Sequence, residues 1–160
     1  GLSHQMYQLD RVRDLLEPTE IAAVADWPII REIEFPAGKV LLLHGSPPDP
    51  QFGYVYPDTD LEQFGVMSYA AVFLGNTHRP FIRVQGDTTW INVGSCGLPR
   101  DDGRYGAAAL FDIESGQASI VRFDITGATR QALKRCPDVM EPVRQVFHRR
   151  ATELVGSIRG

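Results

Sequence analysis

Two short apolar runs, each ending abruptly at a polar turn that contains glycine, constrain the fold of this chain more than any other feature. The first covers residues 40–43 and is followed by His44 and Gly45. The second covers residues 71–74 and is followed by the sequence Gly-Asn-Thr-His at residues 75–78. Continuous apolar runs of this length are typical of strands buried on both faces of a sheet. Ligands of open α/β sheets bind just beyond such strand ends. The pattern therefore predicts a sheet whose rim brings the two histidine-bearing turns together.

Hydrophobic periodicity and turn residues predict the other elements. Alternation over residues 29–35, followed by the turn at 36–39, predicts a half-exposed strand that forms a hairpin with 40–43. Residues 45–60 are rich in proline, glycine and aspartate and predict a stiff loop. Further strands are predicted over residues 71–74, 81–85, 88–93, 105–113 and 117–125, and helices over 9–16, 19–25, 58–69 and 137–155. Pro18 is expected to stop the first helix and Thr19 to cap the second.

Composition limits the function classes that this chain can serve. Its 160 residues predict a single domain, and 43% hydrophobic with 22% charged residues is ordinary for a soluble globular protein. The net charge of −4 excludes a general nucleic-acid binder that neutralises phosphates with a basic surface. No apolar stretch approaches the ~18–20 residues of a membrane helix. Cys96 and Cys136 match neither a disulfide framework nor a zinc motif, which favours a reduced, cytoplasmic protein.

His44 and His78 are the candidate metal ligands. An imidazole fixed at the end of a strand suits zinc, manganese, iron or nickel. Asn76 stands two residues before His78, a spacing that places both side chains on the same side of an extended segment. Its amide oxygen can also ligate a divalent ion. The alternative for each histidine is structural, with the ring hydrogen-bonded to a nearby carbonyl.

Other polar motifs carry weaker functional interpretations. Residues 92–97 form a glycine-bearing turn whose N–H groups either cradle an anion or simply complete the turn. Arg79 either contacts a phosphate oxygen or is solvated, and Arg100 either clamps a phosphate or pairs with Asp101. Cys96 has no adjacent basic partner, which argues against a cysteine-dependent hydrolase. Four arginines are predicted to form the solvated face of a C-terminal helix: Arg144, Arg149, Arg150 and Arg159. His4 and His148 are expected to be uninvolved.

Taken in order, three motifs resemble those of the calcineurin-like metallophosphoesterases, and most closely a small bacterial phosphodiesterase-like branch. They are His-Gly-Ser-Pro at residues 44–47, Gly-x-Thr-His-x-Pro at 75–80 and Asn-x-Gly-Ser-x-Gly-x-Pro-Arg at 92–100. The matching stretch extends from residue 40 to residue 124. The resemblance implies an α+β sandwich of two sheets flanked by helices. The whole chain, residues 1–160, would be a single domain that corresponds to the C-terminal portion of the family's domain.

The resemblance also implies a metal centre and a reaction. In the family, the His-Gly histidine and both histidines of Gly-His-x-His bind two divalent ions, which assigns His44, Asn76 and His78 as ligands here. Asn76 replaces the first histidine of the second motif. The implied activity is hydrolysis of a small phosphomonoester or phosphodiester by a hydroxide that the two metals activate. Tyr54 and Arg79 would contact the substrate, with Tyr54 on a wall formed by the loop that follows His44.

The family's upstream motifs, Asp-x-His, Gly-Asp and Gly-Asn-His-Asp/Glu, do not occur among the residues that precede His44. They supply the bridging carboxylate, an asparagine ligand and the histidine that protonates the leaving group, so no catalytic residue is assigned here. We therefore expect the chain alone to have little activity. A half-domain exposes core surface, which would allow pairing with a second copy or with a missing segment. The alternative function is a metal-poor, non-catalytic scaffold or binding module, since fold does not imply function.

Overall fold

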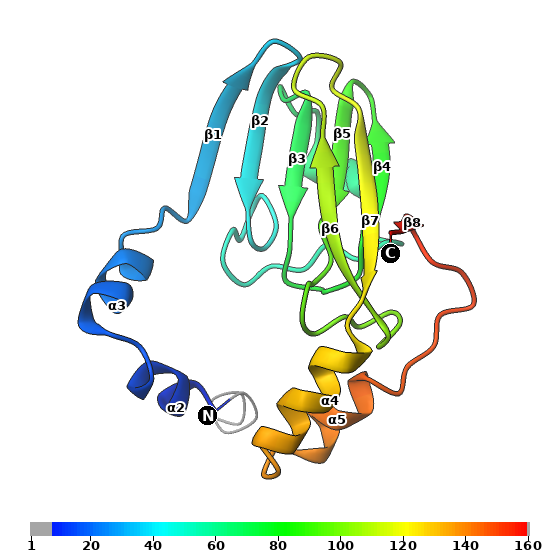
Figure 1. Ribbon diagram of the computed structural model, residues 1–160. Helices are drawn as coiled ribbons and strands as arrows, with labels where there is room; N and C mark the ends of the chain where they lie inside the picture. The colour runs from blue at the N-terminus through cyan, green and yellow to red at the C-terminus, as the bar shows by residue number, and fades with distance from the viewer. Residues whose placement is uncertain (1–7, 160) are drawn as a thin grey trace.

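The structure, a computed structural model, describes residues 8–159, and its strands form two sheets (Figure 1). His4 lies outside the described residues. The five-stranded sheet has the order β1-β2-β3-β5-β4, and the three-stranded sheet has the order β6-β7-β8. The strands are β1 (Ile30–Phe35), β2 (Gly38–Leu43), β3 (Ala71–Leu74), β4 (Phe81–Gln85), β5 (Thr88–Asn92), β6 (Tyr105–Phe111), β7 (Ala118–Asp124) and β8 (Ser157–Ile158).

The centre of the larger sheet is parallel, and its edges are antiparallel. β3 pairs in parallel with both β2 and β5, whereas β1 and β4 form antiparallel hairpins with β2 and β5. One face of these central strands packs against the smaller sheet, through a cluster that includes Val40, Ala71, Ile91, Ala107 and Ile120. Figure 1 shows the two sheets as adjacent layers. The predicted α+β sandwich is therefore confirmed.

The opposite face of the larger sheet is also buried, because the long segment between β2 and β3 folds over it. Val55 and Leu61 of that segment are 1% and 3% exposed. They form one cluster with residues of the sheet: Leu41, Leu43, Val72, Leu74, Phe81 and Trp90. Burial on both faces explains why residues 40–43 of β2 and all of β3 are continuously apolar instead of alternating.

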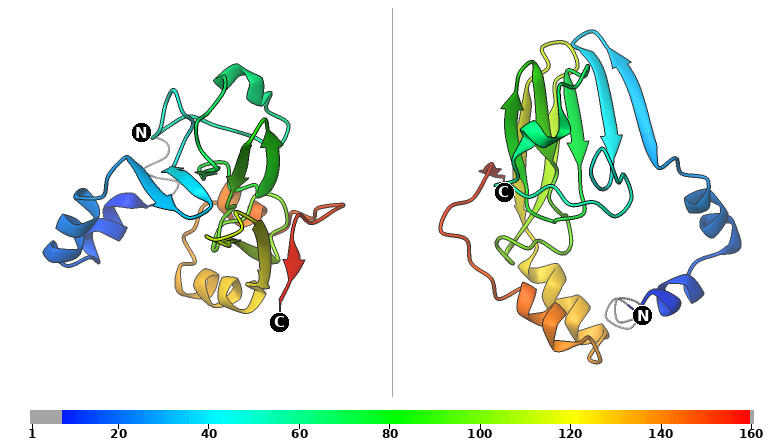
Figure 2. Two further views of the ribbon diagram at one scale, coloured as in Figure 1. Left: turned by 90° about the horizontal axis from the view of Figure 1, so that it is seen from above. Right: turned by 180° about the vertical axis from the view of Figure 1, so that it is seen from behind.

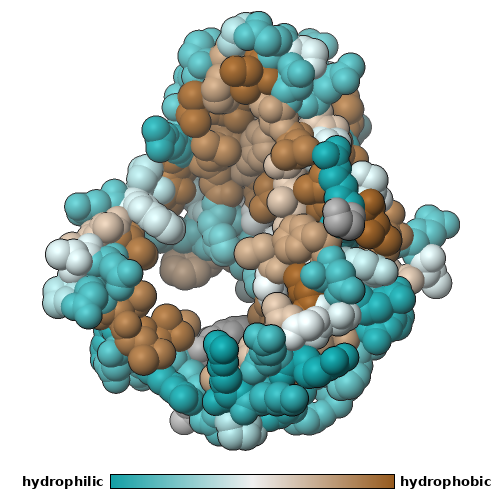
Figure 3. All heavy atoms as spheres, viewed as in Figure 1, coloured by the Kyte–Doolittle hydropathy of each residue, from teal (hydrophilic) through white to brown (hydrophobic). Residues whose placement is uncertain are grey.

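Helices flank the sheets at both ends of the chain. α2 (Leu9–Asp14) and α3 (Pro18–Ala25) precede β1 and contain no buried residue, whereas α4 (Thr126–Arg135) and α5 (Glu141–Val146) follow β7. Figure 2 shows α2 and α3 extending away from the sheets, and Figure 3 shows apolar side chains exposed over this end of the molecule. Across residues 8–159, no helix has the length and apolar character to cross a membrane.

Two predicted helices are wrong. The segment 58–69 contains only η1 (Leu61–Phe64), a short 3-10 helix capped by the Asp60 side chain and followed by Gly65 with a φ of 70°. The segment 137–155 contains only α5, and the chain beyond it returns to β8. Arg149, Arg150 and Arg159 therefore do not lie on a helix. The helix α4 was not predicted, because no apolar face of it is buried.

The predicted cap of α3 is also wrong. Glu17 caps this helix, and its side chain and that of Glu20 form a reciprocal capping box. Pro18 stands at the first helical position, where the missing N–H costs nothing, so it begins α3 as well as separating it from α2. Thr19 lies within the first turn.

Candidate functional site

The two predicted glycine turns lie side by side because β2 and β3 are parallel neighbours. The backbone N–H of Gly75 donates to the carbonyl of His44 at 3.0 Å. A Cβ on residue 75 would lie 3.3 Å from His44 Nδ1, so glycine at this position leaves room for the imidazole. His44 is exposed at the rim. The structure thus brings both motifs to one edge of the sheet, at the carboxyl ends of its central strands.

Asn76 and His78 both have left-handed backbone conformations, with φ of 59° and 58°. Positive φ is uncommon for residues other than glycine, and asparagine and histidine are among the residues that adopt it most often. Strained residues of this kind persist only where the surrounding structure holds them, and they concentrate at functional sites. Two such residues flanking Thr77 mark this turn as held in a specific shape.

Asn92 at the end of β5 holds the turn in that shape. Its side chain is fully buried and donates to the carbonyl of Gly75 at 2.8 Å and to the hydroxyl of Thr77 at 3.0 Å. The Asn92 side-chain oxygen accepts from the N–H of Gly94 at 3.0 Å. The N–H of Gly94 is therefore used within the protein, which favours the plain-turn interpretation of residues 92–97. Sequence reasoning missed this positioning role, although a polar residue ending an apolar strand was visible.

The His78 ring is oriented by a backbone carbonyl. His78 Nδ1 lies 2.8 Å from the carbonyl oxygen of Leu98, which can only accept, so Nδ1 carries the proton and Nε2 keeps a lone pair. Burial lowers the pKa of His78; the hydrogen bond to the Leu98 carbonyl raises it, and the positive charge of Arg100 lowers it. A neutral imidazole anchored through its other nitrogen is the arrangement typical of metal-binding histidines.

Asn76 is partly committed to the loop that follows β2. Its side-chain N–H₂ donates to the carbonyls of Phe52 and Gly53 at 3.3 and 2.8 Å. Only the amide oxygen remains as a ligand atom. The loop itself is tightly closed, since a Cβ on Gly45 would lie 2.4 Å from the carbonyl oxygen of Asp49. Asn76 therefore fastens the loop to the histidine-bearing turn.

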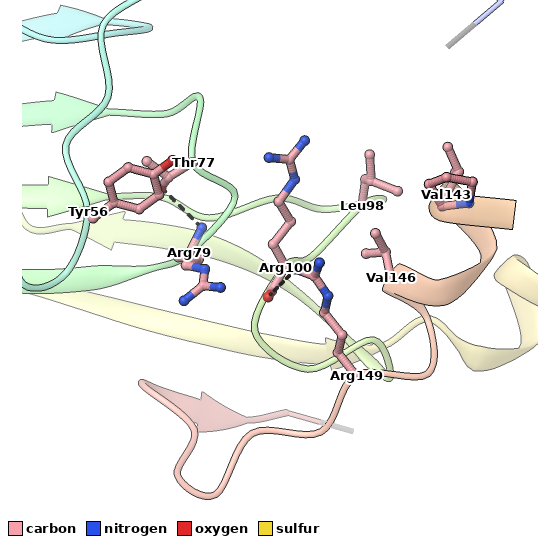
Figure 4. Close-up of a pocket in the computed structure, with 9 residues that line it drawn as sticks. Tyr56, Thr77, Arg79, Leu98, Arg100, Val143, Val146 and Arg149 are labelled. Atoms are coloured by element: carbon pink, nitrogen blue, oxygen red, sulfur yellow. Dashed lines mark hydrogen bonds between the residues drawn. The ribbon is translucent and has the colours of Figure 1, made fainter. Parts of the chain in front are cut away.

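The turn at residues 75–79 separates two hollows, and the two predicted substrate residues lie in different ones. Tyr54 lines a hollow of about 430 Å³ together with His44 and Asn76. Arg79 lines a pocket of about 290 Å³ together with Tyr56 and Thr77, which Figure 4 draws. The rings of Tyr54 and Tyr56 stack at 5.9 Å between centroids and so link the two hollows.

The donor atoms present fit one divalent ion better than two. His44 and His78 supply imidazole nitrogens and Asn76 supplies a neutral oxygen. Among residues 8–159, no three side chains of His, Cys, Asp or Glu gather as a metal-binding group. Because a bridged pair of ions needs carboxylates to balance its charge, the ligands described here correspond to part of such a centre. Cys96 and Cys136 are free thiols and belong to neither hollow.

The fold is similar to that of two solved structures. A metallophosphoesterase from Sphaerobacter thermophilus superposes with a TM-score of 0.69 and 20% identity, over 83% of this chain and 62% of that chain. The hypothetical protein PH1004 from Pyrococcus horikoshii superposes with a TM-score of 0.66 and 17% identity, over 79% of this chain and 52% of the other. Identities this low establish the fold alone.

The sequence settles the family. Residues 17–116 match the calcineurin-like phosphoesterase superfamily domain, which is more than half of the chain. The chain therefore belongs to the calcineurin-like phosphoesterase superfamily, whose members generally use divalent metals. The uncharacterized protein MJ0912 of Methanocaldococcus jannaschii is 29% identical over 132 residues, covering 69% of this chain and 53% of the relative. The chain thus spans about half the length of this curated relative.

Proposed function

We propose that this chain contributes part of the active site of a metal-dependent phosphoesterase that hydrolyses a small phosphomonoester or phosphodiester. The observation that carries the proposal is the neighbouring pair His44 and His78 at the sheet rim, with His78 Nδ1 bonded to Leu98 and Nε2 left for a ligand. Superfamily membership supports the same reaction class. The complete site that we propose is a two-metal centre with manganese, zinc, iron or nickel, of which this chain supplies part of the ligands.

Each residue of the site has a proposed task. His44 and His78 hold metal through imidazole nitrogens, and Asn76 adds its amide oxygen. Bound divalent ions supply charge stabilisation at the phosphoryl oxygens and an activated nucleophile. Tyr54 forms a wall beside His44 and Asn76, and Arg79 contacts a phosphate oxygen from the far side of the turn. Because no described residue supplies a bridging carboxylate, we expect the chain alone to hydrolyse p-nitrophenyl phosphate esters slowly or not at all.

The second candidate function is a metal-poor scaffold, with a small phosphate ester or a second copy of the chain as the partner. The observation that favours it is the commitment of the Asn76 amide to Phe52 and Gly53 at a ligand position. The two functions differ in metal content, since a scaffold needs none. We propose a cytoplasmic location for either function, in keeping with the two free thiols.

Zinc titration by calorimetry tests the proposal. We expect wild-type protein to bind at least one equivalent, and His44→Ala and His78→Ala each to weaken binding about tenfold or more, because a ligand is lost. The matched control is His148→Ala, since His148 is exposed and distant in sequence from both motifs. Binding that survives both rim substitutions, or no binding by the wild type, would support the scaffold instead.

A further inference from the structure

The pocket beside the histidine turn is lined by arginines that come from separate segments. Arg79 follows β3, Arg100 lies before β6, and Arg149 follows α5. Figure 4 shows Arg100 and Arg149 between Thr77 at one end and the apolar residues of α5 at the other. The pocket has a volume of about 290 Å³, which suits a small group and not a whole cofactor.

The pocket carries positive charge without an acidic lining residue. Within the described part of the chain, the Arg79 guanidinium makes no hydrogen bond or ion pair. Arg149 uses Nη1 to bond the carbonyl of Arg100 at 3.1 Å, which leaves further donors on the same guanidinium. The two nearest carboxylates in sequence are engaged elsewhere: Asp101 pairs with Arg122 at 2.6 Å and Asp102 with Arg104 at 2.8 Å. Neither of them neutralises the pocket through these contacts.

A buried carboxylate holds the C-terminal wall of this pocket in place. Asp102 is fully buried, and besides Arg104 it accepts from the N–H of Ala151 at 3.2 Å. The N–H of Gly103 donates to the carbonyl of Arg149 at 3.1 Å. Residues 102–103 therefore attach the segment that carries Arg149 to the loop that carries Arg100. The arginines are presented by a fixed framework and not by a free tail.

The same pocket shares a wall with the candidate metal ligands. Leu98, which lines it, accepts the hydrogen bond from His78, and the N–H of Arg100 donates to the carbonyl of His78 at 3.0 Å. Thr77, also in the lining, stands between Asn76 and His78. A substrate that reaches across this turn would place one group at the histidines and another at the arginines.

We propose that the arginine pocket binds a second phosphoryl group of the substrate, so that the enzyme selects phosphate esters that carry another phosphate beside the scissile one. This selectivity rests on the proposed phosphoesterase function. Guanidinium groups form paired, charge-assisted hydrogen bonds with phosphate oxygens, which ammonium groups do not match. The wall from Pro142 to Arg149 lies outside the residues that match the superfamily domain, whereas Arg79 and Arg100 lie within them.

Phosphate titration in the presence of a metal chelator tests the pocket apart from the metal centre. Amide chemical shifts of the purified chain report the affinity for inorganic phosphate and, separately, for acetate. We expect phosphate to bind at least tenfold more tightly than acetate, and Arg79→Ala and Arg149→Ala each to weaken phosphate binding about tenfold. Arg130→Ala removes an exposed charge on α4 as the control and is expected to change affinity less than twofold.

Three results would overturn the inference: no phosphate binding by the wild type, equal affinity for acetate, or an equal loss in Arg130→Ala. Arg79 is exposed, so its substitution is expected to leave the fold intact, which the amide spectrum checks directly. If the chain binds phosphate but not zinc, the proposed phosphoesterase function is wrong and the pocket is an anion site only. If the chain binds zinc but not phosphate, only the proposed second phosphate subsite is wrong.

Discussion

The central strands and the N-terminal helices of this protein are both rich in apolar residues, yet they differ completely in burial. Val72 and Trp90 in the sheet are fully buried, whereas Leu15 and Trp27 in the helical segment are 78% and 72% exposed. The turns that carry the candidate site follow the buried strands. The difference teaches that the sandwich supports the turns of the site. The helices α2 and α3 contribute no buried residue, and Trp27 borders the hollow beside His44 from the outside.

The largest expected effect is the loss of a side chain from the centre of the larger sheet. Trp90→Ala should lower the free energy of unfolding by about 3–5 kcal/mol, because it removes a fully buried ring that stacks on Phe64. Urea unfolding followed by fluorescence and circular dichroism measures it. A loss below about 1 kcal/mol would show that the sheet centre is not the stabilising core.

Asn92→Ala should have a smaller effect on stability and a specific one on the site. It leaves the carbonyl of Gly75 and the hydroxyl of Thr77 without their partner, at a cost of about 2–3 kcal/mol. Amide exchange of residues 75–78 should accelerate more than that of β3, and zinc affinity should fall. Gln131→Ala, exposed on α4, is the matched control. Unchanged exchange in the turn would contradict a positioning role for Asn92.

Asp102 makes part of the stability dependent on pH. Hydrogen bonds from the side chain and N–H of Arg104, against some desolvation, hold the pKa of Asp102 well below its usual range. Its stabilising contribution is therefore complete above about pH 4, the pKa of an unfolded aspartate, and is lost as the pH falls through the lower folded value.

Asp102→Asn should consequently lower stability at pH 7 and flatten the decline in acid. Urea midpoints between pH 7 and pH 2.5 measure both effects. Asp87→Asn, at an exposed position in the β4–β5 turn, is the control. If the Asp102 variant follows the same acid profile as the wild type, the carboxylate does not stabilise the folded chain in the way described.

The smallest effect is expected in the helical segment. Leu15→Ala should change the free energy of unfolding by no more than about 0.5 kcal/mol, because the side chain is largely exposed, and it should leave zinc affinity unchanged. The same urea and calorimetric measurements apply. A loss comparable to that of Trp90→Ala would mean that this segment is part of the core in solution, and the contrast between the two regions would disappear.

The sequence predicted the strands better than the helices, for a physical reason. β3 matches its predicted bounds because burial imposes an apolar pattern on it, and β4 matches because Pro80 and Gly86 bound it. α4 was missed because none of its residues is buried, whereas the helix predicted at 58–69 is wrong because the helical turn η1 ends at Gly65, whose φ is 70°. A helix without a buried apolar face imposes no hydrophobic periodicity on its sequence, so α4 leaves no such pattern to detect.

The candidate site was predictable only in part. Parallel strands end at the same edge, so the approach of His44 to the turn of His78 followed from local pattern alone. The support from Asn92 and the position of Arg149 depend on contacts between segments far apart in the chain. Arg149 was interpreted as a solvated helix residue because the sequence does not reveal that Gly103 binds its carbonyl.

The nitrogen resonances of the His78 ring test the central claim most directly. Long-range nitrogen–proton correlation spectra distinguish the protonation states of the two ring nitrogens. We predict that Nδ1 carries the proton at neutral pH, and that added zinc shifts the Nε2 signal of His78 while leaving that of His148 unchanged. A His78 ring protonated on Nε2, or one whose signals do not respond to zinc, would contradict the assignment of His78 as a metal ligand.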